Sequence, residues 1–293
     1  MNNTLLSKSK KNNTLLSKSK SKKDILFIFY KYFRVNNHKI TFYYNEEHNT
    51  IYIEIYSSYD KSNPCIELNF TKTEMEIDYL SKCLFNESES MYNISKGVGN
   101  KSLKHLINIG SDLKLKKLIL YDASNINISY IYNGESNKYR ISLAIYKILI
   151  EGQSWYNKNG FKSINHEKEK IEWDKIRNEP FFITFLKFKD ATMKKNITKL
   201  LEYKVDVTEE ILEILDKYNE LQTRFIIFFE ENSLEYIHKV KDVFKLLDKQ
   251  RLILEGGATV IDKKKADFYY ILKELVKLFK NNINYTHSLV YTY

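Results

Sequence analysis

The sequence predicts an α/β protein, in which an antiparallel meander leads into a mixed sheet and a mostly helical region follows. Three patterns carry this prediction. Residues 39–79 hold short segments that alternate between apolar and polar side chains, as half-buried strands do. A helix with one apolar stripe begins near Gly99 and leads directly into the apolar segment 118–121. Beyond about residue 170, apolar residues recur at helical spacing.

The chain opens with a perfect duplication, because residues 2–10 and 12–20 both read NNTLLSKSK. Residues 1–23 contain seven lysines and no acid, which leaves +3 of the total charge of +10 for the rest of the chain (10 − 7 = 3). Polar low-complexity segments cannot bury a core, so residues 1–23 are predicted to be a disordered basic tail. Two interpretations stay open: an electrostatic tether to nucleic acid or another anionic surface, or a duplication without a role.

Composition narrows the class of protein further. The chain is rich in Lys, Asn, Ile and Tyr and poor in Gly and Pro, which is typical of AT-rich genomes such as those of large DNA viruses. No apolar run approaches the roughly 18 residues of a membrane helix, and no secretory signal is visible. Two cysteines, Cys65 and Cys83, form no disulfide framework and no metal-ligand spacing. We therefore expect an intracellular, cytoplasmic protein, or a virion protein if the genome is viral.

The first predicted elements are a helix and four strands. Asp24 caps an apolar stretch at residues 25–33, which favours a helix. Alternation over residues 51–56 places isoleucines on one face, and residues 74–79 place Glu74, Glu76 and Asp78 on one face. Short links between these segments indicate an antiparallel meander. The four predicted strands cover residues 39–44, 51–56, 65–70 and 74–79.

The next elements form a helix and strand after a glycine pair. Gly97-Val98-Gly99 precedes a stripe that repeats at i, i+3, i+4, i+7 and i+10, made by Leu103, Leu106, Ile107, Gly110 and Leu113. Glycines at the start of a helix leave backbone N–H groups open to a phosphate or pyrophosphate. The strand 118–121 follows, and a second helix over residues 142–150 should stop at Gly152.

The C-terminal part shows helical patterns without recognisable chemistry. Asp206-Val207-Thr208-Glu209 and Asn232-Ser233-Leu234-Glu235 resemble capping boxes ahead of apolar stripes. Residues 265–279 predict a further helix. Residues 181–188 are expected to form a strand that extends the first sheet.

Taken together, the meander, the Gly97-Val98-Gly99 loop, the helix, the strand and a later Tyr-x-x-x-Gly-Phe at residues 156–161 resemble the GNAT superfamily of N-acetyltransferases. The resemblance covers roughly residues 40–165 and implies a GNAT-like acyl-CoA-binding domain over residues 24–169, with a mostly helical region over residues 170–293. It implies acetyl-CoA as co-substrate, its pyrophosphate held by the start of the helix. The residues that would hold it are Gly97, Val98, Gly99, Asn100, Lys101 and Ser102.

The resemblance also implies catalytic roles. In the family, the tyrosine of the second signature lies near the CoA sulfur and protonates the departing thiolate; Tyr156 takes that position, and a phenol is protonated at neutral pH. The general base, where the family uses one, is often a carboxylate on the strand before the loop, so Glu74, Glu76 and Asp78 stay open. Ile94 stands where the family prefers Arg or Gln, and residues 125–138 have the size of an insertion.

The function implied is acetyl transfer from acetyl-CoA to an amine that the sequence does not identify. The alternatives are a GNAT-fold protein that has lost catalysis and serves as a structural or interaction protein, for example in a virion, and a protein that contacts nucleic acid through its Lys-rich tail. His105 and His166 have no partner at metal or triad spacing, and no metal site is predicted.

Overall fold

The computed structural model describes nine stretches of the chain. These are residues 22–33, 39–45, 50–56, 63–71, 73–80, 98–203, 207–231, 238–254 and 261–293. The predicted disordered tail, residues 1–23, lies outside the described residues except for its last two positions.

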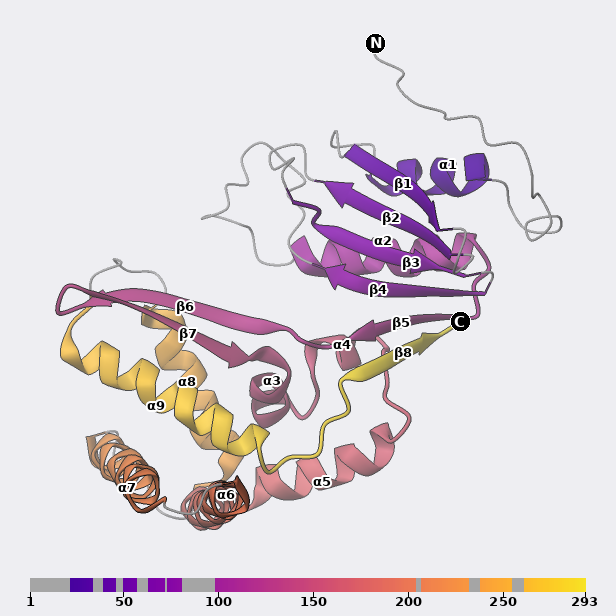
Figure 1. The fold of residues 1–293 in the computed structure, drawn as a ribbon. Coiled ribbons are helices and arrows are strands. Elements are labelled where there is room, and N and C mark those ends of the chain that lie inside the picture. Colours follow the sequence, from indigo (N-terminus) through magenta and orange to yellow (C-terminus); the bar gives the residue numbers. More distant parts are fainter. Residues whose placement is uncertain are drawn as a thin grey trace. The chain divides into compact units, whose positions relative to one another are not determined.

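The chain divides into two compact units (Figure 1). Unit 1 comprises Met1–Tyr121 together with Val290–Tyr293, and unit 2 comprises Asp122–Leu289. Unit 2 is thus inserted into unit 1 between two segments of the chain. This division differs from the expected one at residues 169 and 170, because the segment with Tyr156 belongs to unit 2.

Unit 1 is built on a mixed sheet of six strands. The strand order is β1-β2-β3-β4-β5-β8, and β1 to β4 form the expected antiparallel meander. The four meander strands lie within a residue or two of their predicted positions. The strands are β1 (Lys39–Asn45), β2 (Thr50–Tyr56), β3 (Ile66–Phe70), β4 (Glu74–Leu80), β5 (Lys117–Tyr121) and β8 (Ser288–Thr292).

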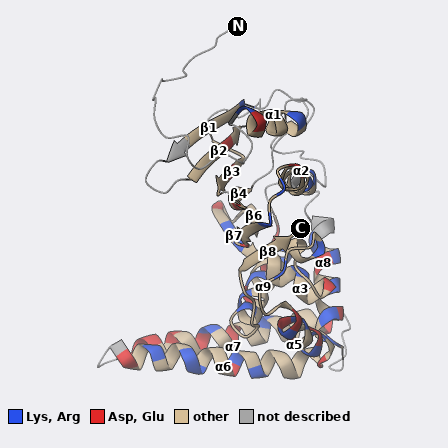
Figure 2. Cartoon of the chain, turned by 90° about the vertical axis from the view of Figure 1, so that its right-hand side faces the viewer, with Lys and Arg blue, Asp and Glu red and all other residues tan. Residues whose placement is uncertain are grey.

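Two helices cover one face of this sheet, α1 (Lys22–Phe33) and α2 (Val98–Asp112) (Figures 1 and 2). Phe29 of α1 packs edge-on against Phe70 of β3, with ring centroids 5.8 Å apart. Phe33 of α1 contacts His105 of α2 in the same manner. The apolar side chains of every second strand residue are buried on this face, which explains why alternation predicted the strands. They include Ile51, Ile53, Ile55, Ile66, Leu68, Phe70, Met75, Ile77, Leu118 and Leu120.

The parallel pair β4 and β5 is joined through α2. Its register runs from Glu74 opposite Lys117 to Ile77 opposite Leu120. On its other side, β4 pairs with β3 through an irregularity: Leu68 faces Ile77 and Glu67 faces Tyr79. Asp78 is therefore an extra residue, a β-bulge, placed immediately after the last residue of β4 paired with β5.

Strand β8 returns from unit 2 to the sheet beside β5. The Tyr293 N–H donates to the Lys116 carbonyl at 3.2 Å, and the Asp122 N–H donates to the His287 carbonyl at 2.8 Å. The end of β8 thus lies beside the start of β5, and the start of β8 lies beside the end of β5, so the two strands are antiparallel. The Tyr293 hydroxyl reaches α2 and donates to the Ile107 carbonyl at 2.6 Å.

Cys65, directly before β3, is disulfide-bonded. Two cysteines without a disulfide framework had predicted reduced thiols instead. The other cysteine of the chain, Cys83, lies outside the described residues.

Unit 2 begins with a β-hairpin, β6 (Asn125–Tyr132) and β7 (Glu135–Ser142). Its two-residue turn is Asn133-Gly134, with φ of 51° and 79°, as a tight hairpin turn requires. This hairpin occupies the stretch that the sequence marked only as insertion-sized. The helix α3 (Leu143–Glu151) follows and ends at Gly152, as expected, with a left-handed φ of 83°.

The remaining helices of unit 2 enclose an aromatic core. Its largest fully buried side chains include Trp173, Phe181, Phe185, Phe225, Phe244 and Phe279. The predicted strand at residues 181–188 is wrong: this stretch begins a long helix, and Phe181, Phe185 and Phe188 repeat at helical spacing on its buried side. The helices are α4 (Trp155–Lys158), α5 (His166–Asn178), α6 (Phe181–Tyr203), α7 (Thr208–Glu231), α8 (Val240–Leu254) and α9 (Lys263–Lys280).

The structure confirms a mixed α/β fold and, in α7 and α9, two of the predicted C-terminal helices. Asn232-Ser233-Leu234-Glu235 lies outside the described residues, and α8 begins at Val240. Within the described part of the chain, the hydropathy of every helix falls short of what crossing a bilayer demands.

Candidate functional site

The start of α2 is the predicted pyrophosphate site. Gly97 lies outside the described residues, and α2 begins at Val98-Gly99. A helix that connects two parallel strands runs back along the sheet, so its N-terminus lies at the carboxyl end of β4. The N–H groups of the first helical turn and the helix dipole at that end favour an anion.

Two polar side-chain atoms near this end of α2 are buried without a hydrogen-bond partner among the described residues. Ser102 is fully buried, and its Oγ has no hydrogen-bond partner among the described residues. The Oδ1 of Asn100 is in the same condition. Lys101, between them, is exposed. Ser102 is therefore a predicted binding residue whose hydroxyl has an unused hydrogen-bonding capacity, whereas the buried Oδ1 of Asn100, an acceptor, would not bind an anion.

The three acids of β4 have different surroundings. Glu74 forms an ion pair with Lys117 at 2.8 Å across the parallel ladder. Asp78, at the bulge, accepts a hydrogen bond from Asn69 at 2.5 Å. Partial burial, then the neighbouring charges of Glu76 and Glu67, raise the pKa of Asp78 to about 6. Asp78 thus stands apart from Glu74 as a carboxylate that exchanges protons near neutral pH.

Tyr156 lies on α4 in a tightly built segment. Ser154 and Asn157 form a reciprocal capping box, and the Asn157 side chain also donates to the Phe161 carbonyl at 2.9 Å. The Tyr156 ring is 8% exposed and contacts the rings of Trp155 and Phe161. Burial, and the charge of Asp122, raise the pKa of Tyr156, so its hydroxyl stays protonated.

Asp122 is a buried acid that sequence reasoning missed. It is 1% exposed, and its carboxylate accepts hydrogen bonds from the Tyr285 hydroxyl and the Ser124 hydroxyl, each at 2.5 Å. The ring Nδ1 of His287 lies 2.6 Å from the Asp122 carbonyl oxygen. Burial and the Asp122 charge raise the pKa of Tyr285. An acid directly after the apolar strand β5 was the only sequence signal for this cluster.

Glu169 and His166 are two further buried polar residues of α5. Glu169 accepts from the Ser163 hydroxyl at 2.6 Å and from the backbone N–H and hydroxyl of Thr286 at 2.9 and 2.5 Å. Burial and the charge of Lys162 lower the pKa of His166, which stacks edge-on against Trp173. His166 is thus a largely neutral, packed residue. His105 packs against Tyr32 and Phe33 in unit 1.

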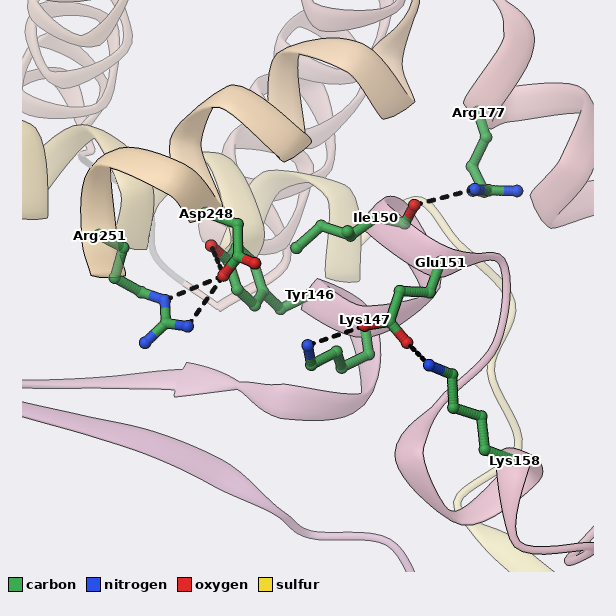
Figure 3. A network of polar contacts seen from close by, with 8 residues as sticks. All are labelled: Tyr146, Lys147, Ile150, Glu151, Lys158, Arg177, Asp248 and Arg251. Carbon is green, nitrogen blue, oxygen red and sulfur yellow. Dashed lines mark hydrogen bonds and ion pairs between the residues drawn. The ribbon is translucent and has the colours of Figure 1, made fainter. Parts of the chain in front are cut away.

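Polar contacts around α3 form a third group (Figure 3). The Tyr146 hydroxyl donates to Asp248 at 3.0 Å, and Arg251 pairs with the same carboxylate at 2.8 Å. Glu151 lies between Lys147 and Lys158, which lower its pKa although burial opposes them. These polar groups pair with one another and connect α3 to α8 and to α4, so their role is to stabilise the fold.

The predicted site residues therefore fall into two sets. Asn100, Lys101, Ser102 and the β4 acids belong to unit 1, and Tyr156 belongs to unit 2. In the described stretches, His, Cys, Asp and Glu side chains nowhere gather in a group of three or more that could hold a metal ion.

Comparisons with known proteins add no relative. No family model matches the chain, and no curated protein or solved structure matches it either.

Proposed function

We propose that the protein is an acyl-CoA-dependent N-acyltransferase that transfers acetyl from acetyl-CoA to an amine. One observation carries the proposal. After the antiparallel meander, β4, α2 and β5 form a parallel unit, and β4 bulges at Asp78 where its register with β5 ends. A bulge that ends the pairing of two parallel strands beside a helix N-terminus would leave room for an extended, anionic co-substrate.

The residues near the start of α2 fit a pyrophosphate. Gly99 adds no side chain at the first turn, and the backbone N–H groups there carry partial positive charge. The buried Ser102 hydroxyl, which has no partner among the described residues, would donate to a phosphate oxygen. Lys101 adds an exposed positive charge. Bound acetyl-CoA would supply the activated acetyl group as a thioester.

Asp78 is the proposed proton acceptor for the amine. With a pKa of about 6 its carboxylate is mostly ionised at pH 7, yet it is a stronger base than an ordinary aspartate. An ammonium group held near Asp78 and Glu76 would lose a proton to Asp78, and the free amine would attack the thioester carbonyl. Glu74 is less suited because Lys117 pairs with it.

Tyr156 remains the predicted donor of the proton that the departing thiolate takes up. The raised pKa keeps this hydroxyl protonated. The assignment rests on the resemblance of residues 155–161 to the family's second signature. Tyr156→Phe tests it, since the ring and its packing stay while the hydroxyl is lost.

The test is a thermal-shift titration with acetyl-CoA. Binding at roughly 100 times the dissociation constant stabilises a protein by about 2.7 kcal/mol, so the melting temperature should rise. Gly99→Asp should remove the shift, because it adds a side chain and a negative charge where the pyrophosphate would lie. Glu213→Gln, on the exposed side of α7 in unit 2, is the control and should keep it. No shift at millimolar acetyl-CoA would contradict the proposal.

A second candidate is a GNAT-like protein without catalysis that serves as a structural or interaction protein. The observation that favours it is the burial of Tyr156, of which 8% is exposed. An acetyl-CoA shift without turnover on a panel of amines would select this candidate. Loss of roughly 10²- to 10⁴-fold in turnover rate on Tyr156→Phe, with the shift kept, would select the enzyme.

A further inference from the structure

One face of the unit 1 sheet bears carboxylates and tyrosines. The helices α1 and α2 pack on the other face, which holds the apolar side chains. Tyr43, Tyr79 and Tyr121 are 52%, 48% and 66% exposed. We call this surface the carboxylate–tyrosine face. Its residues, placed by strand register and alternation, are Lys39, Thr41, Tyr43, Tyr52, Glu54, Tyr56, Glu67, Asn69, Glu74, Glu76, Asp78, Tyr79, Lys117, Ile119 and Tyr121.

This face carries an excess of negative charge. Its five carboxylates outnumber its two ammonium groups by three, and Lys117 is already paired with Glu74. Glu54 and Glu67 lie directly opposite each other on β2 and β3. Like charges in a cross-strand pair are destabilising, so a cation placed between them would be bound favourably. Partial burial raises the pKa of Asp78, and the neighbouring charges of Glu76 and Glu67 add to that rise.

The face already binds one ammonium group. The Nζ of Lys39 lies over the Tyr56 ring, 5.2 Å from its centroid. Tyr56 donates its hydroxyl to Glu54 at 2.9 Å, so a lysine above this ring also lies near a carboxylate. An ammonium over a tyrosine ring beside a carboxylate gains both cation–π and charge–charge attraction. Tyr43 and Tyr79 present exposed rings of the same kind on β1 and β4.

The sequence contains a segment with the complementary charge. Residues 1–21 hold five lysines and no acid, and α1 begins at Lys22 in the same unit. Fully extended, 21 residues span roughly 70 Å, whereas six strands at about 4.8 Å spacing span roughly 24 Å. The segment is long enough to pass around the sheet edge. Its attachment to α1, which packs on the opposite face of the same sheet, gives it an effective concentration on the order of millimolar at the carboxylate–tyrosine face.

The lysine spacing fits the face as well. Both copies of the repeat end in Lys-Ser-Lys, at Lys8 and Lys10 and at Lys18 and Lys20. In an extended chain such lysines lie on one side, roughly 7 Å apart. Glu76 and Asp78 have the same two-residue spacing along β4. Two lysines of one repeat could therefore each lie near a separate carboxylate.

We propose that the carboxylate–tyrosine face docks the chain's own lysine-rich segment, residues 1–21, through ammonium–carboxylate pairs and cation–π contacts. The docking does not depend on any reaction. If the proposed N-acyl transfer holds, and only then, the docked lysines are acyl acceptors beside Asp78. The substrate class would then be lysine side chains in basic, acid-free segments.

The test is zero-length cross-linking of the full chain with a carbodiimide, without acyl-CoA. The reagent joins a lysine amine to a nearby carboxylate as an amide, with loss of water, and mass spectrometry identifies the joined peptides. We expect cross-links from the lysines of residues 1–21 to Glu67, Glu76 and Asp78. They should disappear in 1 M salt, where the screening length falls to about 3 Å.

Two triple variants with the same charge change give the control. Glu67→Gln, Glu76→Gln, Asp78→Asn neutralises the face and should remove these cross-links to the face entirely. Glu202→Gln, Glu213→Gln, Asp216→Asn neutralises exposed acids on α6 and α7 and should leave them unchanged. A mixture of ¹⁵N-labelled and unlabelled protein shows whether each cross-link is within one chain.

Three results would overturn the docking. The cross-links could be spread evenly over the exposed acids of both units, or could form only between differently labelled copies. In the face variant, residues 1–21 could also cross-link to the neighbouring Glu54 in an amount that high salt does not reduce. Added duplex DNA that displaces all cross-links at 0.15 M salt would assign the segment to nucleic acid instead. The acetyl-CoA thermal shift is measured separately. If wild-type protein shows the cross-links but no acetyl-CoA shift, the proposed enzyme activity is contradicted and the docking stands. If it shows the shift but no cross-links, only the docking is contradicted.

Discussion

At the scale of single residues, Gly152 shows how one position joins two helices. It ends α3 with a φ of 83°, and its N–H donates to the Ile148 carbonyl. Arg177 of α5 lies against it and donates to the carbonyls of Leu149 and Ile150 at 3.1 and 3.0 Å. A Cβ at Gly152 would lie 2.6 Å from the Arg177 Nη1. Glycine is therefore required there both by the backbone and by the guanidinium.

Gly152→Ala should lower the free energy of unfolding by about 2–3 kcal/mol, measured by urea denaturation. Left-handed strain accounts for about 1–2 kcal/mol, and displacement of Arg177 from the end of α3 adds to it. Gly134→Ala is the matched control, since Gly134 has a similar φ of 79° but no atom within 4 Å of an added Cβ. Equal losses for the two variants would show that Arg177 contributes nothing at Gly152.

Asp78 predicts a pH dependence of stability. Its pKa is about 6 in the fold against an ordinary 3.8, so folding disfavours the charged form. Stability should therefore be highest below about pH 4 with respect to this group, and fall as pH rises from 4 through 6. Because Asp78 is only partly buried, solvent screening limits the effect to about 1 kcal/mol or less.

Asp78→Asn should remove this component, so that the variant is more stable than wild type at pH 7.5 and the difference closes toward pH 4. Chemical denaturation at several pH values measures it. Glu74→Gln serves as comparison, because it loses the ion pair with Lys117 and should not be stabilised. A variant–wild-type difference that does not vary between pH 4 and 7 would contradict the raised pKa.

At the scale of elements, local patterns predicted what local forces determine. Apolar and polar residues alternate along strands β2 to β4, and α2 and α9 carry apolar stripes. The spacing of apolar residues alone therefore predicted the positions of these elements. The hairpin β6–β7 was missed although Asn133-Gly134 between alternating segments is a strong hairpin signal. Residues 181–188 were predicted as a strand because eight mostly apolar residues are too few to distinguish the two-residue period of a strand from the 3.6-residue period of a helix. The helical period emerges only over the whole of α6.

The contact between α2 and Tyr293 gives a prediction for an element. An added Cβ at Gly110 would overlap the Tyr293 hydroxyl, which donates to the Ile107 carbonyl. Alanine normally stabilises a helix interior by about 1 kcal/mol relative to glycine. Here we expect Gly110→Ala to destabilise unit 1, because it displaces Tyr293 from the helix.

In a Tyr293→Ala background the sign of the Gly110→Ala effect should reverse, giving a gain of about 0.5–1 kcal/mol. Urea denaturation of the four proteins in this double-mutant cycle measures the coupling. Tyr293→Phe separates the ring from the hydroxyl, since it loses only the hydrogen bond. If Gly110→Ala stabilises the protein even with Tyr293 present, the docking of Tyr293 on α2 is contradicted.

At the scale of the whole molecule, the insertion of unit 2 could not be predicted from the sequence. Strand β8 is short, and its partner β5 lies more than 160 residues earlier in the chain. No local pattern links Ser288-Leu289-Val290 to Leu118-Ile119-Leu120, because pairing over that separation depends on the intervening fold. For the same reason the sequence could not show that Gly99 and Tyr156 belong to different compact units.

The insertion predicts that each unit folds without the other. The ends of unit 2 are held together by its own residues, since Asp122 donates its N–H to His287 and accepts from Tyr285. A fragment of residues 122–289 should therefore melt cooperatively, with its aromatic core intact.

In unit 1, replacement of residues 122–287 by Asn-Gly would join the antiparallel strands β5 and β8 as a two-residue hairpin. That shortened chain should also melt cooperatively, and it should keep the acetyl-CoA shift if the start of α2 holds the pyrophosphate. Circular dichroism and calorimetry of both chains measure this. A fragment that shows helical signal without a cooperative transition would mean that the core of unit 2 needs unit 1 to order it, and the two units would then fold as one.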